Sequence, residues 1–255
     1  MASVLDRFSL RGKVALVTGS STGLGQAMSL AFAEAGASVV GVDYVDSPDT
    51  KKQIEARRGK FHSLVADLMT LEPLQHLVDE TVRVFGKVDI LVNNAGIIRR
   101  QDILDFTEKD WDEVVDLNLK TVFFLSQAVA RQFIKQNSGG KIINIASMLS
   151  FQGGIRVVSY TASKSGVAGI TKAMANEWAK HNITCNAIAP GYMATNNTAP
   201  LRADAERSQD ILNRIPAGRW GQPDDLMGPA LFLASSASDY MTGAVIPVDG
   251  GWLAR

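Results

Sequence analysis

The sequence has one cysteine, three histidines and no net charge, and each scarcity excludes a class of protein. Cys185 alone cannot form an internal disulfide, and its apolar neighbours favour a buried core thiol over a nucleophile. His62, His76 and His181 lie scattered without a metal-ligand spacing, so no metal site is expected. The 26 basic and 26 acidic residues balance, which leaves no electrostatic footprint for nucleic acid.

Long apolar runs are also missing. No run approaches the roughly 18 apolar residues of a membrane span. The first residues, interrupted early by Asp6 and Arg7, lack the apolar core of a signal peptide. We therefore expect a cytoplasmic protein without nucleic-acid or membrane partners.

The sequence alternates short β-branched runs with longer segments of helical spacing. Strands are predicted over residues 13–18, 38–43, 61–66, 88–92, 142–146, 183–189 and 244–248. Helices are predicted over residues 24–35, 74–85, 110–136, 160–181 and 224–234. Such alternation is typical of a parallel sheet covered by helices on both faces. Since no repeat or linker divides the chain, we predict one α/β domain over residues 1–255, a Rossmann-like doubly wound sheet of about seven strands.

Residues 18–25, Thr-Gly-Ser-Ser-Thr-Gly-Leu-Gly, connect the first predicted strand to the first predicted helix. Glycines there let the backbone turn sharply and approach a pyrophosphate at the positive end of the helix. The spacing differs from the common Gly-x-Gly-x-x-Gly of dinucleotide sites, and a glycine-rich turn can also be a simple tight connection. The predicted cofactor contacts in this turn are Gly19, Ser21, Thr22, Gly23, Leu24 and Gly25.

Asp43 ends the second predicted strand, about twenty residues after this turn. A carboxylate in that position can accept hydrogen bonds from the ribose hydroxyls of an adenosine. The same charge repels a 2′-phosphate, and residues 18–25 contain no Arg or Lys to attract one. We therefore predict NAD(H) rather than NADP(H); the alternative is that Asp43 only caps the end of its strand.

Tyr160 and Lys164 lie four residues apart at the start of a predicted helix, so their side chains share a face. A phenol with a reference pKa of about 10 is a poor base at neutral pH, and a neighbouring ammonium is expected to lower that pKa. Ser147 follows a predicted buried strand, where its hydroxyl can hydrogen-bond the oxygen whose proton Tyr160 moves. Alone, the Tyr-Lys pair would more often be an ordinary helix-surface contact.

Other motifs favour a catalytic role for the Tyr-Lys pair over a helix-surface contact. Taken together and in their order along the chain, the motifs resemble those of the short-chain dehydrogenases/reductases over essentially the full length of the sequence. The matching motifs are residues 18–25, Asp67-Leu68, Asn93-Asn94-Ala95-Gly96, Asn118, Ser147, Tyr160-x-x-x-Lys164 and Pro190-Gly191. Each motif is weak alone, whereas the ordered set is specific.

This resemblance implies further roles. The remaining cofactor contacts would be Asp67, Leu68, Asn94, Ala95 and Gly96 on the adenosine side, and Pro190, Gly191 and Thr195 over the nicotinamide. Lys164 would bind the nicotinamide ribose beside Tyr160, and Asn118 would hold a water in a proton relay with Lys164. Since members of the family are often tetramers, a homotetramer paired through the two longest predicted helices is also implied.

Four segments narrow the likeness within the family. Residues 94–100, 147–156, 189–198 and 249–255 resemble sugar-acid dehydrogenases of pectin and uronate breakdown, with substrates of the deoxy-hexulosonate type. Such a substrate needs a cation for its carboxylate, and Arg suits a bidentate grip on carboxylate. The candidate substrate contacts are Arg99, Arg100, Ser147, Met148, Gln152, Arg156 and Asn197. Each Arg could equally be a solvated surface charge, and the sequence leaves open which one binds the carboxylate.

The sequence thus predicts an NAD(H)-dependent oxidoreductase that transfers a hydride between a nicotinamide and a sugar-acid carbon. Its predicted catalytic residues are Asn118, Ser147, Tyr160 and Lys164. A 3-oxoacyl thioester reductase or a polyol dehydrogenase of the same family is the alternative among enzymes, and a preference for NADPH would favour the reductase. A non-catalytic nucleotide sensor is the alternative outside enzymes, and the complete catalytic set argues against it.

Overall fold

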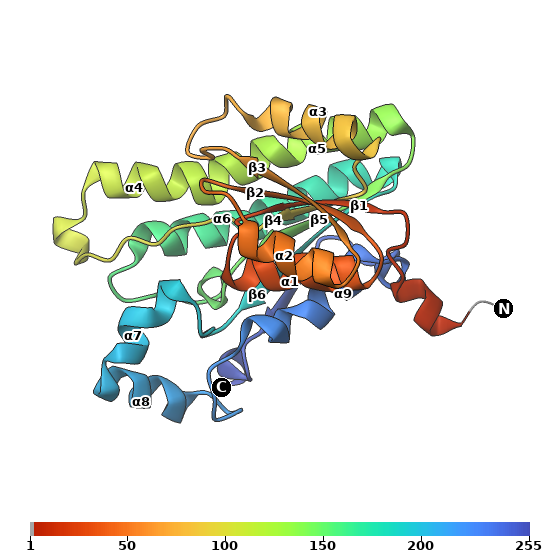
Figure 1. The fold of residues 1–255 in the computed structure, drawn as a ribbon. Helices are drawn as coiled ribbons and strands as arrows, with labels where there is room; N and C mark the ends of the chain where they lie inside the picture. Colours follow the sequence, from red (N-terminus) through yellow and green to blue (C-terminus); the bar gives the residue numbers. More distant parts are fainter. Residues whose placement is uncertain (1–2) are drawn as a thin grey trace.

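The β-branched runs form a parallel sheet in the structure, a computed structural model that describes residues 3–255 (Figure 1). Its seven strands are β1 (Val14–Thr18), β2 (Ser38–Asp43), β3 (Lys60–Val65), β4 (Ile90–Asn93), β5 (Gly140–Ile145), β6 (Ile183–Pro190) and β7 (Val245–Val248). They follow the order β3-β2-β1-β4-β5-β6-β7, and every neighbouring pair is parallel. The direction of sheet growth reverses between β1 and β4, which is where open α/β sheets bind ligands. The predicted fold class is confirmed.

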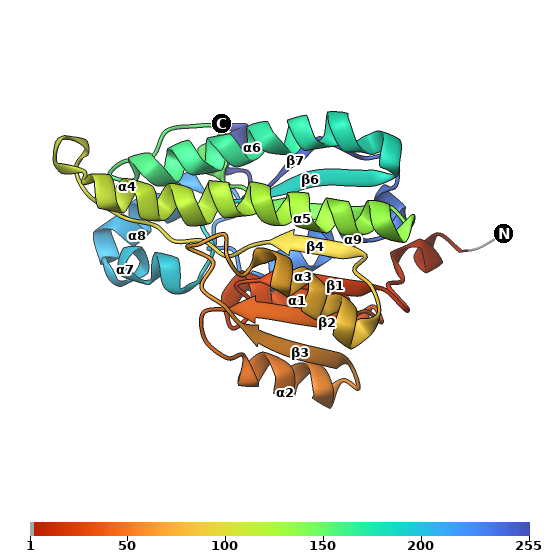
Figure 2. The ribbon, with the colours of Figure 1, turned by 90° about the horizontal axis from the view of Figure 1, so that it is seen from above.

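Helices cover both faces of this sheet (Figure 1). They are α1 (Gly23–Glu34), α2 (Pro48–Ala56), α3 (Leu74–Phe85), α4 (Glu108–Val115), α5 (Thr121–Gln136), α6 (Val158–Trp178), α7 (Ala199–Ala203), α8 (Ala205–Arg214) and α9 (Met227–Ala234). α1, α2 and α9 bury one apolar core against the sheet, and α3, α5 and α6 bury another on the opposite face. Figure 2 shows α7 and α8 beyond the carboxyl ends of the strands. Within residues 3–255, no helix has both the length and the apolar character needed to cross a membrane.

Three helical features differ from the expectation. α2 was not predicted, although Pro48 at its first turn is a favourable helix start, because the helix buries little beyond Thr50 and Ile54. The single helix expected over residues 110–136 is divided by a π-helical turn, Asp116–Lys120. α7 and α8 were not predicted either, since they bury few apolar residues.

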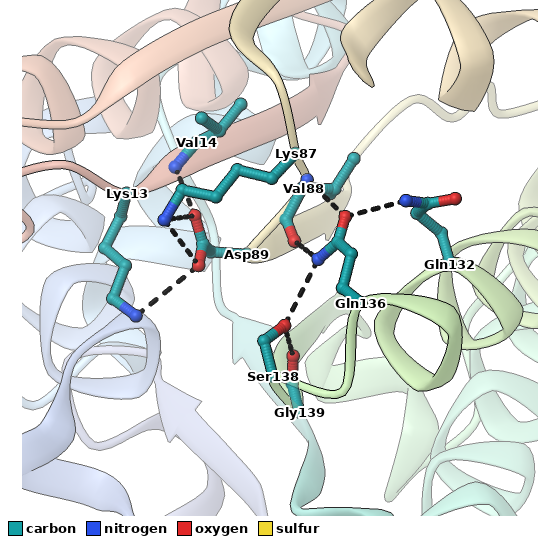
Figure 3. Close-up of polar contacts among 9 residues, drawn as sticks. All are labelled: Lys13, Val14, Lys87, Val88, Asp89, Gln132, Gln136, Ser138 and Gly139. Carbon is teal, nitrogen blue, oxygen red and sulfur yellow. Dashed lines mark hydrogen bonds and ion pairs between the residues drawn. The ribbon is translucent and has the colours of Figure 1, made fainter.

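Side-chain hydrogen bonds fix the amino ends of β1 and β4 (Figure 3). The buried carboxylate of Asp89 accepts from the backbone N–H of Val14 at 2.9 Å and from the ammonium of Lys87 at 3.0 Å. The side-chain amide of Gln136, at the end of α5, accepts from the N–H of Val88 at 3.0 Å and donates to its carbonyl at 2.8 Å. These bonds join the strands at the edge opposite to their carboxyl ends.

Asp89→Ala should lower the free energy of unfolding by about 2–3 kcal/mol, because it leaves the buried N–H of Val14 without an acceptor and removes a charged partner. For a protein of this size, that loss corresponds to a fall in Tm of about 4–12 °C, measurable by circular dichroism. Lys13→Ala is the control, since Lys13 also pairs with Asp89 but its side chain is 51% exposed. We expect this exposed pair to contribute at most about 1 kcal/mol. Equal shifts in the two variants would contradict this role of Asp89.

Candidate active site

The candidate residues gather where the strands end. Thr18, Asp43, Asn93 and Pro190 are the last residues of β1, β2, β4 and β6, and Ser147 follows β5 by two residues. Because these strands are parallel, their carboxyl ends share one edge of the sheet. The segments identified from the sequence are therefore brought together at this edge.

The glycine turn between β1 and α1 is closely packed. Gly19 has a φ of +66°, which an L side chain rarely adopts. A Cβ on Gly25 would lie 2.0 Å from the carbonyl oxygen of Gly19, so no larger residue fits there. The side-chain amide of Asn94 donates to the carbonyls of Thr18 at 2.9 Å and Gly19 at 3.1 Å. Asn94 thus holds this turn against the end of β4.

The N-terminus of α1 offers unpaired backbone donors. In the described chain, its N-cap residue Thr22 makes no side-chain capping hydrogen bond. The first N–H groups of a helix and its positive dipole end suit a phosphate. Thr195, from the loop after β6, lies across the turn, because a Cβ on Gly23 would be 3.6 Å from its Cγ2. These features fit a nucleotide diphosphate between the turn and this loop.

Asp43 lies against the same turn and is 8% exposed. One of its carboxylate oxygens accepts from the backbone N–H of Ser21 at 3.0 Å and from the Ser21 hydroxyl at 2.6 Å. The other oxygen accepts from the N–H of Tyr44 at 2.8 Å. Asp49 lies near the same turn, because the side-chain amide of Gln26 donates to its carboxylate at 3.0 Å and to the carbonyl of Ser21 at 3.2 Å.

The other predicted cofactor residues border this edge. The carboxylate of the exposed Asp67 accepts from the N–H of Met69 at 2.9 Å. The buried Leu68 uses its carbonyl to accept from the hydroxyl of Thr121 at 2.7 Å. The backbone N–H of Gly191 donates to the carbonyl of Val248 at 3.0 Å, which joins the loop after β6 to the end of β7. The remaining members of this group are Ala95, Gly96 and Pro190, at the ends of β4 and β6.

Ser147, Tyr160 and Lys164 lie together between the end of β5 and the first turns of α6. Ser147 and Lys164 are buried, with 6% and 4% exposed. The ammonium of Lys164 donates to the carbonyl of Ile145 at 2.6 Å and lies 5.6 Å from the centre of the Tyr160 ring. The Ser147 hydroxyl accepts from the N–H of Leu149 at 3.1 Å. The structure therefore places Ser147, Tyr160 and Lys164, the predicted proton-transfer residues, close together.

Burial dominates the titration of this cluster. It raises the pKa of Tyr160, while a hydrogen bond with Ser147 and the positive charge of Arg100 act to lower that pKa. Burial also lowers the pKa of Lys164 to about 8. The expected lowering of the Tyr160 pKa is therefore outweighed by burial in the protein alone. Arg100 is a second cation near the phenol, a role that the sequence did not indicate.

Asn118 lies in the π-helical turn and is fully buried. Its side-chain amide accepts from the N–H of Ile97 at 2.9 Å and donates to the carbonyl of Ile97 at 2.8 Å. A weaker bond of 3.4 Å reaches the hydroxyl of Ser163, which itself donates to the carbonyl of Tyr160. The Asn118 side chain therefore joins the segment after β4 to the first turns of α6.

Two of the three candidate arginines are paired with acids. Arg99 donates to the carboxylate of Glu113 at 2.7 and 3.0 Å. Arg156 is exposed and lies 3.4 Å from the carboxylate of Asp102. Both guanidinium groups are thus already neutralised within the chain.

Arg100 differs from both. It donates to the carbonyl of Asn197 at 2.9 Å, and no ion pair involves it among residues 3–255. Partial burial lowers the pKa of Arg100, and charge on Tyr160 or Tyr192 would act against that shift. Arg100 is therefore a cation without an acidic partner, close enough to Tyr160 to influence its charge.

The sequence missed two aromatic residues of this region. Tyr192 and Trp252 pack with Tyr160 in one apolar cluster that also includes the candidate Met148. The candidate Gln152 is bound to this cluster, since its side-chain oxygen accepts from the indole N–H of Trp252 at 3.2 Å. Tyr192 directly follows Pro190-Gly191 and Trp252 lies within residues 249–255, so both belong to segments that already carried the resemblance.

Comparisons with known proteins agree with this geometry. The model of the short chain dehydrogenase family matches residues 13–206. The 2-dehydro-3-deoxy-D-gluconate 5-dehydrogenase of Escherichia coli (strain K12) is 66% identical over 252 residues, which cover 99% of this chain and 100% of that protein. The protein of the same name from Bacillus subtilis (strain 168) is 51% identical over 258 residues, covering 100% of both.

A similar solved structure comes from Agrobacterium tumefaciens and contains bound NADP. It is 54% identical with a TM-score of 0.92, and the match covers 98% of this chain and 99% of that chain. Since the family model matches more than half of the chain and these relatives match nearly all of it, the protein belongs to the short chain dehydrogenase family of oxidoreductases.

Proposed function

We propose that the protein is an NAD(H)-dependent oxidoreductase that interconverts a hydroxyl and a keto group on a deoxy-hexulosonate-type sugar acid. The observation that carries the proposal is Arg100, a guanidinium without an acidic partner beside the Tyr160 phenol. A substrate with both a carbonyl and a carboxylate would satisfy these two groups together. The named activity of the Escherichia coli and Bacillus subtilis relatives supports the same substrate class.

In this proposal Tyr160 moves the proton at the reacting oxygen. During reduction its hydroxyl donates the proton, and during oxidation the phenolate accepts one. Ser147 donates a hydrogen bond to the same oxygen and orients it. Because burial raises the pKa of Tyr160, the phenol stays protonated at neutral pH, which favours its action as an acid in the reduction direction.

Lys164 would provide positive charge on the inner side of the phenol. Its buried ammonium is held by the carbonyl of Ile145 at 2.6 Å. Asn118 would support the proton path indirectly, because it fixes Ser163 one turn from Tyr160 and holds Ile97 after β4. These four residues form the catalytic set that we propose.

The glycine turn, the N-terminus of α1 and Thr195 would hold the cofactor, which supplies or accepts the hydride. We propose NAD(H) because the carboxylate of Asp43 lies against this turn and would repel a 2′-phosphate. The similar structure from Agrobacterium tumefaciens contains NADP, so the preference for NAD(H) over NADP(H) has to be measured directly for this protein.

The proposal is tested by initial rates of the purified protein with NADH and NADPH, on a 3-deoxy-hexulosonate diketo acid and on a 3-oxoacyl thioester. We expect faster reduction of the sugar acid, with NADH as the better cofactor. Activity on the thioester alone would overturn the substrate, and a preference for NADPH would overturn the cofactor.

The role of Arg100 gives a second prediction in the same assay. Arg100→Met should raise KM for the sugar acid by about 10- to 100-fold, which corresponds to losing a charged hydrogen bond. Arg156→Met is the matched control, because Arg156 is exposed like Arg100 but is paired with Asp102. If both variants raise KM equally, Arg100 is not the carboxylate contact.

We also propose that the protein works as a homotetramer in the cytoplasm. A groove between α5 and α6, bordered by Ile134 and Trp178, supports assembly through these helices, since Ile134 is 45% exposed. Mass photometry of the purified protein tests the tetramer, and a monomer at micromolar concentration would contradict it.

A further inference from the structure

Residues 249–255, which follow β7, form a turn that is held by hydrogen bonds from its own backbone to the Asp249 side chain. The carboxylate of Asp249 accepts from the N–H groups of Gly251 at 2.8 Å and Leu253 at 2.9 Å. Gly250 and Gly251 have φ values of +65° and +90°, a conformation that other residues rarely adopt. We call residues 249–255 the C-terminal clasp.

The C-terminal clasp holds the end of α8. The carbonyl of Gly250 accepts from the N–H of Ala217 at 3.0 Å. The guanidinium of Arg255 donates to the carbonyls of Asn213 at 2.8 Å and Arg214 at 3.2 Å. A cation at the last carbonyls of a helix satisfies their hydrogen bonding and the negative end of the dipole. Since α8 buries Ile211 as its main anchor, these polar bonds contribute to its placement.

Trp252 joins the C-terminal clasp to the candidate active site. Its side chain is buried, and its indole N–H donates to Gln152 at 3.2 Å. Its ring packs against Tyr192, with centres 4.8 Å apart and planes at 67°. The guanidinium of Arg214 lies 4.0 Å from the centre of the same ring. One side chain thus contacts the loop after Ser147, the loop after β6 and the end of α8.

These contacts surround the substrate side of the site. Gln152 and Tyr192 belong to the two loops that flank Tyr160, and Tyr192 also lies near the charge of Arg100. The other hydrogen bond to the Gln152 oxygen is the 3.5 Å contact from Arg214, so the indole N–H is its stronger partner. Loss of that donor would leave the Gln152 side chain without a fixed orientation beside the substrate.

We propose that Trp252 is a positioning residue: through Gln152, Tyr192 and α8 it sets the shape of the substrate pocket, and thereby the affinity for substrate. It does not touch the reacting atoms. The inference rests on the proposed function for the location of the substrate beside Tyr160 and Arg100. It predicts an effect on KM that leaves kcat and cofactor binding in place.

The test is a double-mutant cycle in the full-length protein. Trp252→Phe keeps the aromatic contact with Tyr192 but removes the N–H, and Gln152→Leu removes the acceptor. Each should raise KM for the sugar acid by about 3- to 10-fold, as expected for one neutral hydrogen bond. The double variant should be no worse than the poorer single variant, because both remove the same interaction. kcat and the Kd for NADH, measured by fluorescence, should stay within about twofold, a range small beside the KM effect.

Trp111→Phe is the control, since Trp111 lies on α4, is 40% exposed and is outside the clasp contacts. An unchanged KM in Trp252→Phe, or KM effects that multiply in the double variant, would overturn the proposal. So would a parallel loss of kcat, NADH affinity and Tm, which would indicate general damage. If the wild-type protein does not reduce the sugar acid, the proposed function fails, and the cycle is measured with the carbonyl substrate that it does reduce.

Discussion

Replacing Tyr160 by Phe should lower kcat by about 10³-fold, a typical contribution of general acid–base catalysis. The substitution removes the hydroxyl that is close to Ser147 and under the influence of Arg100, while the ring can still pack with Tyr192 and Trp252. Binding of NADH should therefore persist, because the contacts of the glycine turn with Asp43 and Asn94 are unaffected. Stopped-flow or steady-state rates, with NADH fluorescence titration, measure both quantities.

Tyr240→Phe is the matched control for this experiment. Tyr240 is fully exposed on the connection between α9 and β7, so removal of its hydroxyl should leave kcat unchanged. Near-normal turnover of Tyr160→Phe would show that another group moves the proton. Loss of NADH binding in that variant would instead show that the phenol is needed to hold the cofactor.

Replacing Lys164 by Met should abolish most turnover and yet raise the Tm at pH 7. We expect kcat to fall by about 10²-fold or more, since proton transfer at Tyr160 loses the adjacent charge. Stability should rise because an ammonium that burial disfavours is replaced by an apolar chain of similar length. The carbonyl of Ile145 loses its donor, at a cost of about 1–3 kcal/mol, which is smaller than the several kcal/mol that burying a charge costs.

The pH dependence of the Tm tests whether the buried charge of Lys164 destabilises the fold. The pKa of Lys164 is lowered from 10.5 to about 8, so the charged form weakens folding. This destabilisation is fully present below pH 8 and disappears as the pH rises toward 10.5, because the folded protein releases its proton first. The Tm advantage of Lys164→Met should therefore shrink between pH 7 and pH 10. Lys172→Met, at an exposed position on the same helix, should show no such change; an equal advantage at both pH values would refute the argument.

The sequence was sufficient for the sheet and for the identity of the residues at its carboxyl edge. Strands such as β1 and β2 are mostly apolar on both faces, and such runs are recognisable without tertiary information. α2 was missed because its few buried residues give little periodic signal. The strands can be predicted from the local sequence pattern, whereas α2 depends on tertiary packing.

The charge state of the site could not be predicted in the same way. Arg99 meets Glu113 and Arg156 meets Asp102 through folding of distant segments, so the sequence left all three arginines equivalent. The sign of the Tyr160 pKa shift was also missed, because it depends on burial by residues that are remote in the sequence. Trp252 was overlooked for the same reason: its partner Gln152 lies 100 residues away.

The π-helical turn between α4 and α5 makes the length of this region critical. A π turn contains one residue more than an α-helical turn, so α4 and α5 are offset by one position along a continuous axis. Val114 before the turn and Leu125 after it are both buried, and Asn118 is held between them against Ile97. Deleting one residue here would restore a regular helix and keep its two ends in phase, whereas a deletion elsewhere in the helix would rotate everything beyond it by about 100°. The spacing between Thr107 and Gln136 is thus a constraint on which insertions and deletions this protein can accept.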